Sequence, residues 1–87
     1  MKTLNLIFHT DPGHGWLEVP KTLISELGIE DQITTCSYMD DENGYLEEDC
    51  DAAVFADAAK SQGYELTIDE RYKEHTPIRN LRSFSVN

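Results

Sequence analysis

Two histidines and a carboxylate near the start of the chain, His9, Asp11 and His14, flank the turn sequence Pro12-Gly13. Imidazole and carboxylate groups are ligands that Zn²⁺ accepts, and a catalytic zinc site has three protein ligands and one open position. The spacing His-x-Asp-x-x-His, however, is not that of an established metal motif. We therefore expect turn and packing roles, with Asp11 bonding to backbone amides. A small metal-dependent enzyme that uses these three residues stays as an alternative.

The segment 40–51 is the second chemically distinctive feature, because it carries seven carboxylates and no basic residue. The seven are Asp40, Asp41, Glu42, Glu47, Glu48, Asp49 and Asp51. An EF-hand calcium loop is excluded, since aligning Gly44 with its invariant glycine places Met39 and Cys50 where the first carboxylate and the bidentate glutamate are required. The segment predicts an outward-facing acidic binding surface, and a solvated run of charges is the alternative interpretation.

The sequence does not favour an acid–base pair of carboxylates or a reactive cysteine. Neighbouring residues of a strand point to opposite faces, so Glu47 and Glu48 would not converge as an acid and base pair. Cys36 and Cys50 lack the CxxC spacing, and we expect both to be reduced. The carboxylates beside Cys50 are expected to raise the pKa of its thiol and make it a poor nucleophile. We predict that the chain is not an enzyme and has no cofactor.

The net charge limits the kinds of partner. The formal value is −10, from 17 acidic and 7 basic residues. Contacts with nucleic-acid phosphates or anionic membranes need Lys and Arg, so we expect a basic protein surface as partner, with no direct nucleic-acid or membrane binding. No apolar run reaches the ~20 residues of a membrane span, and residues 1–8 are too quickly polar for a signal peptide. We predict a cytoplasmic monomer or homodimer.

The length of 87 residues predicts a single domain, 1–87, with a small core. Apolar periodicity and turn signals predict strands over 3–9, 16–19, 33–39, 45–46, 64–68 and 81–86, and helices over 20–27 and 52–62. The order ββαββαββ indicates an α+β domain with two short helices on one face of a mainly antiparallel sheet. Trp16, beside the first turn, either caps the core or is an exposed interface anchor.

Two family resemblances add expectations. The pattern Gly15-Trp16-Leu17-Glu18-Val19-Pro20, then Leu23, Leu27-Gly28-Ile29 and Ile33, resembles the strand-Pro-helix segment of AbrB-type swapped-hairpin regulators and antitoxins, over residues 15 to about 48. This resemblance implies an intertwined dimer that binds DNA through basic residues, although Lys21 is the only cation in the segment.

The second resemblance covers most of the chain. The patterns His14-Gly15-Trp16-Leu17, Tyr45-Leu46-Glu47-Glu48-Asp49-Cys50-Asp51 and Pro77-Ile78-Arg79 are similar to those of small proteins from bacteriophages and other mobile elements. This similarity implies no particular activity. Our leading hypothesis is a noncatalytic acidic module, such as a phage-encoded inhibitor, that docks on a basic protein surface which normally holds nucleic acid. The AbrB-like transcription regulator or antitoxin is the alternative.

Overall fold

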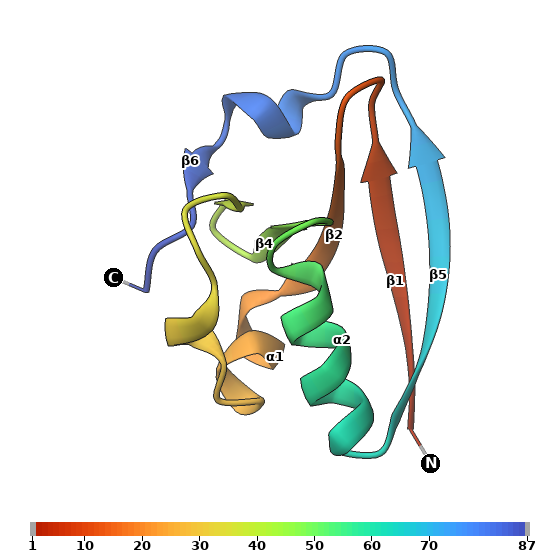
Figure 1. Cartoon of the computed structure of the whole chain (residues 1–87), viewed down its shortest axis with the longest axis vertical. Helices are drawn as coiled ribbons and strands as arrows, with labels where there is room; N and C mark the ends of the chain where they lie inside the picture. The colour runs from red at the N-terminus through yellow and green to blue at the C-terminus, as the bar shows by residue number, and fades with distance from the viewer. Residues whose placement is uncertain (1, 87) are drawn as a thin grey trace.

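A six-stranded sheet with the strand order β5-β1-β2-β4-β3-β6 forms the centre of the molecule (Figure 1). The computed structural model describes residues 2–86. Along the chain the elements are β1 (Lys2–Thr10), β2 (Gly15–Pro20), α1 (Lys21–Glu26), η1 (Glu30–Gln32), β3 (Tyr38–Met39), β4 (Asn43–Glu47), α2 (Ala52–Ser61), β5 (Tyr64–Tyr72), η2 (Pro77–Asn80) and β6 (Arg82–Ser83). The α+β class predicted from the sequence is confirmed.

The sheet is mixed, whereas the sequence predicted a mainly antiparallel one. β1 pairs antiparallel with β2, β2 with β4, and β3 with both β4 and β6. β5 instead runs parallel to β1, in a register that extends from Lys2 opposite Tyr64 to Thr10 opposite Tyr72. β4 runs in the same direction as β1 and β5, so the chain must cross over one face of the sheet between β4 and β5. The segment that contains α2 makes this crossover. No local sequence pattern predicted this crossover.

Several predicted boundaries also need correction, among them the strand over 81–86, which shortens to Arg82–Ser83. Pro20 ends β2 and precedes α1, so it is not a helical residue. The predicted strand 33–39 shortens to Tyr38–Met39, because the residues before it are held in a loop by Asp51. The strand predicted over 45–46 extends to Asn43–Glu47, because Asn43 and Gly44 also pair with β2 and the turn is formed by the residues before them.

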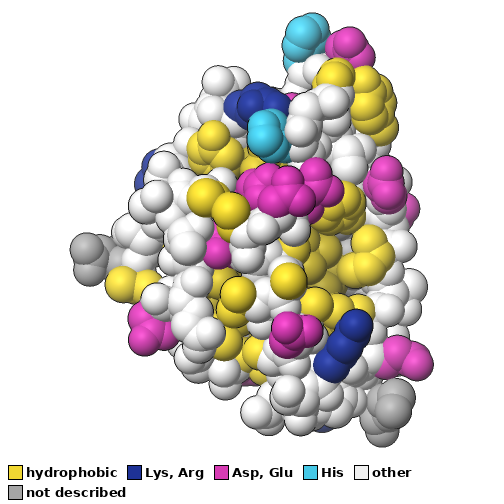
Figure 2. Space-filling view, in the orientation of Figure 1, with side chains coloured by type: hydrophobic (Ala, Val, Ile, Leu, Met, Phe, Trp, Pro, Cys, Tyr) yellow, Lys and Arg dark blue, Asp and Glu magenta, His cyan; other side chains and the backbone are white. Residues whose placement is uncertain are grey.

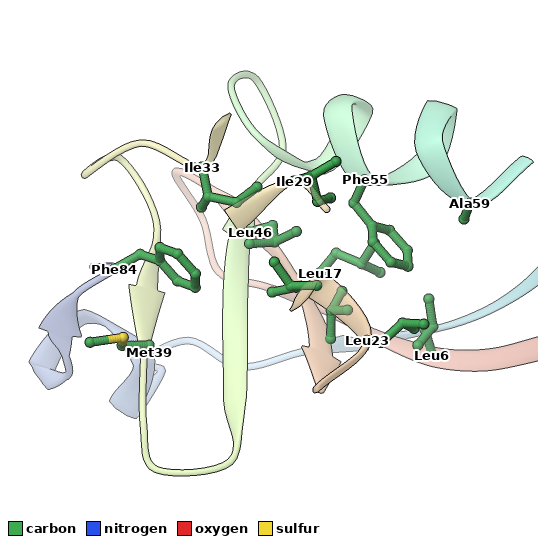
Figure 3. Packing of buried hydrophobic residues seen from close by; sticks show 12 residues of the cluster. Leu6, Leu17, Leu23, Ile29, Ile33, Met39, Leu46, Phe55, Ala59 and Phe84 are labelled. Atoms are coloured by element: carbon green, nitrogen blue, oxygen red, sulfur yellow. The ribbon is translucent and has the colours of Figure 1, made fainter. Parts of the chain in front are cut away.

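The two faces of the sheet are covered differently, because side chains alternate between faces along each strand. Leu17 and Val19 of β2 face the side of α1 and α2, where the main core includes Phe55 (Figures 1 and 3). Figure 3 shows Phe55 pointing from α2 towards Leu17. Trp16, between Gly15 and Leu17, faces the opposite side and forms a second cluster with Tyr45 and Ile78. Among the described residues, no helix has the length and apolar character needed to cross a membrane.

Candidate functional site

The acidic segment 40–51 is divided by β4 into two groups at the ends of that strand. At the first end, Asp40 closes the turn: its Oδ1 accepts from the amides of Glu42 (2.9 Å) and Asn43 (2.7 Å), and its Oδ2 accepts from the Tyr45 hydroxyl (2.7 Å). Burial opposes ionisation, but the hydrogen bonds prevail and lower the pKa of Asp40. Asp40 therefore has a structural role, while Asp41 and Glu42 are exposed.

At the second end, Asp51 and Glu47 are buried. Asp51 is 1% exposed, and its Oδ2 accepts from the Thr34 amide (3.0 Å), the Thr34 hydroxyl (2.9 Å) and the Ser37 hydroxyl. Glu47 accepts from the Asp49 amide at 2.7 Å through Oε1, and its Oε2 lies 3.3 Å from Nδ1 of His14. These two carboxylates hold the loop before β3 and the junction between β4 and α2, so they add little to the exposed acidic surface.

Glu48 and Asp49 are the exposed carboxylates of this junction, and we call this pair the junction carboxylates. Carboxylate oxygens of both lie within 4.8 Å of each other and of one from Glu47. The cluster offers oxygen ligands to a hard cation, but Glu47 already accepts from the Asp49 amide. The two remaining carboxylates supply at most about four of the 6–8 oxygen ligands that Ca²⁺ takes. Their arrangement alone does not define a metal site.

Across the described residues, the ion pairs formed by arginines do not involve the junction carboxylates. Within residues 2–86, Arg79 pairs with Asp11, Arg71 with the exposed Asp69, and Arg82 reaches Asp41 at 3.5 Å with both side chains exposed. In the same range, no Lys or Arg forms an ion pair with the junction carboxylates. Their negative potential is therefore uncompensated at short range.

His9, Asp11 and His14 are not brought together as a metal site. His9 Nε2 lies 2.8 Å from Glu18 Oε1, and His14 faces Glu47. Asp11 Oδ1 accepts from the amides of Gly13 and His14, both at 2.9 Å, which confirms the predicted turn role. Within the described chain, these three residues belong to no cluster of metal-ligating side chains.

The pairing of Arg79 with Asp11 could not be predicted from the sequence. From η2, its Nε donates to Asp11 Oδ2 at 2.6 Å and its Nη2 to Oδ1 at 3.1 Å, and its guanidinium lies 5.2 Å from the centre of the Trp16 ring. The hydrogen bond from Arg79, followed by those from the two backbone amides, holds the pKa of Asp11 well below its usual range. Trp16 itself is 2% exposed, so it caps the second cluster and is not an exposed anchor.

The contact between Asp11 and Arg79 predicts a pH dependence of stability. Because folding lowers the pKa of Asp11 below its ordinary value of 3.8, its stabilising contribution is present above that pH and is lost as the pH falls towards the folded-state pKa. We expect Asp11→Asn to be less stable than the wild type in urea at about pH 7, with the difference shrinking below about pH 4. Asp69→Asn is the control, since its pair with Arg71 is exposed and should contribute under ~1 kcal/mol. A pH-independent difference for Asp11→Asn would contradict the assignment.

The two cysteines are free thiols and interact with each other. The pKa of Cys50 is raised to about 12, first by a hydrogen bond with Cys36, then by burial and the negative charge of Glu47. The predicted direction of the pKa shift is confirmed, but its predicted cause is not: the main cause is Cys36, and the carboxylate that contributes is Glu47 instead of the neighbouring Asp49 and Asp51. At neutral pH the Cys50 thiol stays protonated, which makes it a poor nucleophile.

An apolar groove of about 730 Å³, which the sequence reasoning also missed, lies between α2 and β5. Phe8, Leu66 and Ile68 line it from the sheet, and Ala53 and Ala56 line it from α2. Glu48 also lines it, so this groove adjoins the junction carboxylates. Figure 2 shows acidic side chains gathered just above a hydrophobic stretch on this face. The signal in the sequence was the alanine-rich helix beside an alternating strand.

Comparison of the chain with protein-family models, with curated proteins and with solved structures finds no match.

Proposed function

We propose that the protein is a noncatalytic binding module that docks through its acidic surface on a basic protein surface, such as one that otherwise contacts nucleic-acid phosphates. The observation that supports this best is the position of the junction carboxylates, Glu48 and Asp49. They are exposed, adjoin the carboxylate of Glu47 and have no ion pair with Lys or Arg in residues 2–86. They are thus available to a cationic partner.

The overall charge favours the same kind of partner. At a net charge of −10, the protein repels phosphates and attracts basic surfaces, and opposite fields raise the rate of association. A noncatalytic role is supported by the positions of the side chains that were candidates for metal binding or catalysis. His9, Asp11 and His14 face separate partners, and Cys50 has a pKa of about 12.

Capture of proteins from a cell lysate on the immobilised chain tests the proposal. We expect basic proteins to bind at about 0.1 M salt and to be released at about 1 M, because the Debye length falls from ~10 to ~3 Å. The double variant Glu48→Gln/Asp49→Asn should lose most of this capture. Quantitative mass spectrometry of the bound fractions is the measurement.

The matched control is Glu30→Gln/Asp31→Asn, which removes the same charge from exposed positions in η1. We expect it to keep most of the capture. Equal losses in the two double variants would show that net charge alone is responsible and would contradict a binding role for the junction carboxylates. Capture that is indifferent to salt, or the absence of basic proteins from the bound fraction, would contradict the proposed function.

A further inference from the structure

The groove between α2 and β5 lies where the helical layer does not cover the edge of the sheet. In Figure 1, α2 lies beside β1 and β5, and the groove lies between the helix and these two strands. Their side chains on this face, Phe8, Leu66 and Ile68, line the groove, and Ile68 is 46% exposed. Two packed layers normally bury such a face, so the groove is a suitable place for a further element to pack.

The composition of α2 makes room for that element. Its side chains along the groove include Ala52, Ala53 and Ala56, which project little from the helix. Small residues allow a second helix to approach at the short end of the usual interaxial distances of ~8–10 Å. A strand added to the outer edge of β5 would extend the sheet and leave the groove uncovered. The shape therefore favours a helix laid beside α2.

The charges at the two ends of the groove differ. Glu48 lines one end, near the start of α2, and Asp49 lies beside it. Lys60 and Glu65, whose charges offset each other, line the groove near the end of α2. Ala52 and Lys60 are eight positions apart in α2, which places the two ends ~12 Å apart. A second copy of this chain, itself at −10, is disfavoured by repulsion.

We propose that this groove binds an amphipathic helix of a partner protein, with an apolar face towards Leu66 and Ile68 and basic residues at the end that meets the junction carboxylates. Helix-in-groove recognition uses such faces, with apolar anchors at i, i+3, i+4 and i+7. The inference rests on the proposed function, because it names the element of the basic partner that is recognised. It adds an apolar contribution that salt does not screen.

Three synthetic peptides of ~15 residues test it on the full chain. The first places Leu at i, i+3, i+4 and i+7 with Lys on the polar face, the second has the same composition in scrambled order, and the third replaces Lys with Glu. Affinities are measured by fluorescence anisotropy, and the contact surface by amide chemical-shift changes. We expect only the first peptide to bind tightly, with shifts centred on α2 and on Leu66 and Ile68.

Two groove variants and one matched control complete the experiment. We expect Ile68→Thr to weaken the first peptide about fivefold, since part of one apolar side chain is lost from the interface, and Ala53→Glu to weaken it further by filling the groove. Val86→Thr makes a comparable change at another exposed apolar residue and should leave binding unchanged. Circular dichroism and thermal melts check that each variant is folded.

The outcomes separate this inference from the proposed function. Equal, salt-sensitive binding of the ordered and scrambled peptides would overturn the groove inference while the acidic docking surface stands. Shifts confined to the β5 backbone would indicate strand pairing and would also overturn it. Failure of all three peptides, with lysate capture intact, would likewise overturn the groove alone. Loss of salt-sensitive capture would contradict the proposed function itself.

Discussion

Asp51→Ala is expected to lower the free energy of unfolding by about 3 kcal/mol. The side chain is 1% exposed and its Oδ2 accepts from the amide and hydroxyl of Thr34 and from the hydroxyl of Ser37. Removing the carboxylate leaves the fully buried Ser37 hydroxyl without its acceptor, which is costly, and also removes the acceptor of the part-buried bonds from Thr34. For a domain of this size the midpoint of thermal unfolding should fall by about 15 °C.

The effect should be large because Asp51 joins three segments. Ser37 Oγ, which donates to Asp51, also accepts from the Glu47 amide at 3.0 Å, and the Ser37 carbonyl accepts from the Phe84 amide. The loop before β3, the end of β4 and the residue that follows β6 therefore depend on one carboxylate. Loss of Asp51 should destabilise them together.

Urea and thermal denaturation measure this prediction. Asp51→Asn keeps one acceptor oxygen and nearly the same volume, so it should lower the free energy of unfolding less than Asp51→Ala does. Comparing the two variants separates the effect of lost hydrogen bonds from that of lost volume. Asp41→Ala is the control, because its side chain is 96% exposed and substitutions at such surface positions usually stay within ~0.5 kcal/mol. Equal stability of Asp51→Ala and the wild type would show that the network does not hold the loop.

The local elements could be predicted from the sequence because their signals are local. Pro20 and Gly28 bound α1, and the alanine-rich segment forms α2 before Gly63. The parallel pairing of β5 with β1 could not be predicted, since strand order depends on contacts distant in sequence. The charged residues after Ile68 also hid the continuation of β5 as far as Tyr72, because exposed edge strands need no apolar alternation.

The candidate site was predicted only as a region of charge. The density of carboxylates in residues 40–51 was evident, but the sequence could not show that Glu47 and Asp51 turn inward while Glu48 and Asp49 remain exposed. That division depends on donors such as Ser37, more than ten residues away in the chain from Asp51. The groove between α2 and β5 was equally hidden, because the crossover creates it.

Trp16→Ala is expected to lower the free energy of unfolding by about 4 kcal/mol, within the range for removing a large buried aromatic side chain. The indole packs with Ile78 and Tyr45, its ring centre lies 6.3 Å from that of Tyr38, and the Arg79 guanidinium covers it. Its loss would leave a cavity between the sheet and η2. An exposed anchor would instead change stability by ~0.5 kcal/mol or less.

Trp16→Phe separates packing from polarity at the same position. The indole Nε1 of Trp16 is buried and has no acceptor among residues 2–86, so phenylalanine removes an unsatisfied donor while it keeps an aromatic ring under Arg79. We expect Trp16→Phe to lower the free energy of unfolding by less than ~2 kcal/mol, a smaller loss than for alanine. Removing the unsatisfied donor is favourable and offsets part of the loss caused by the smaller ring. Urea denaturation of both variants measures the difference. Near-equal, small effects of the two substitutions would show that Trp16 is not part of the buried cluster that fastens η2 to the sheet.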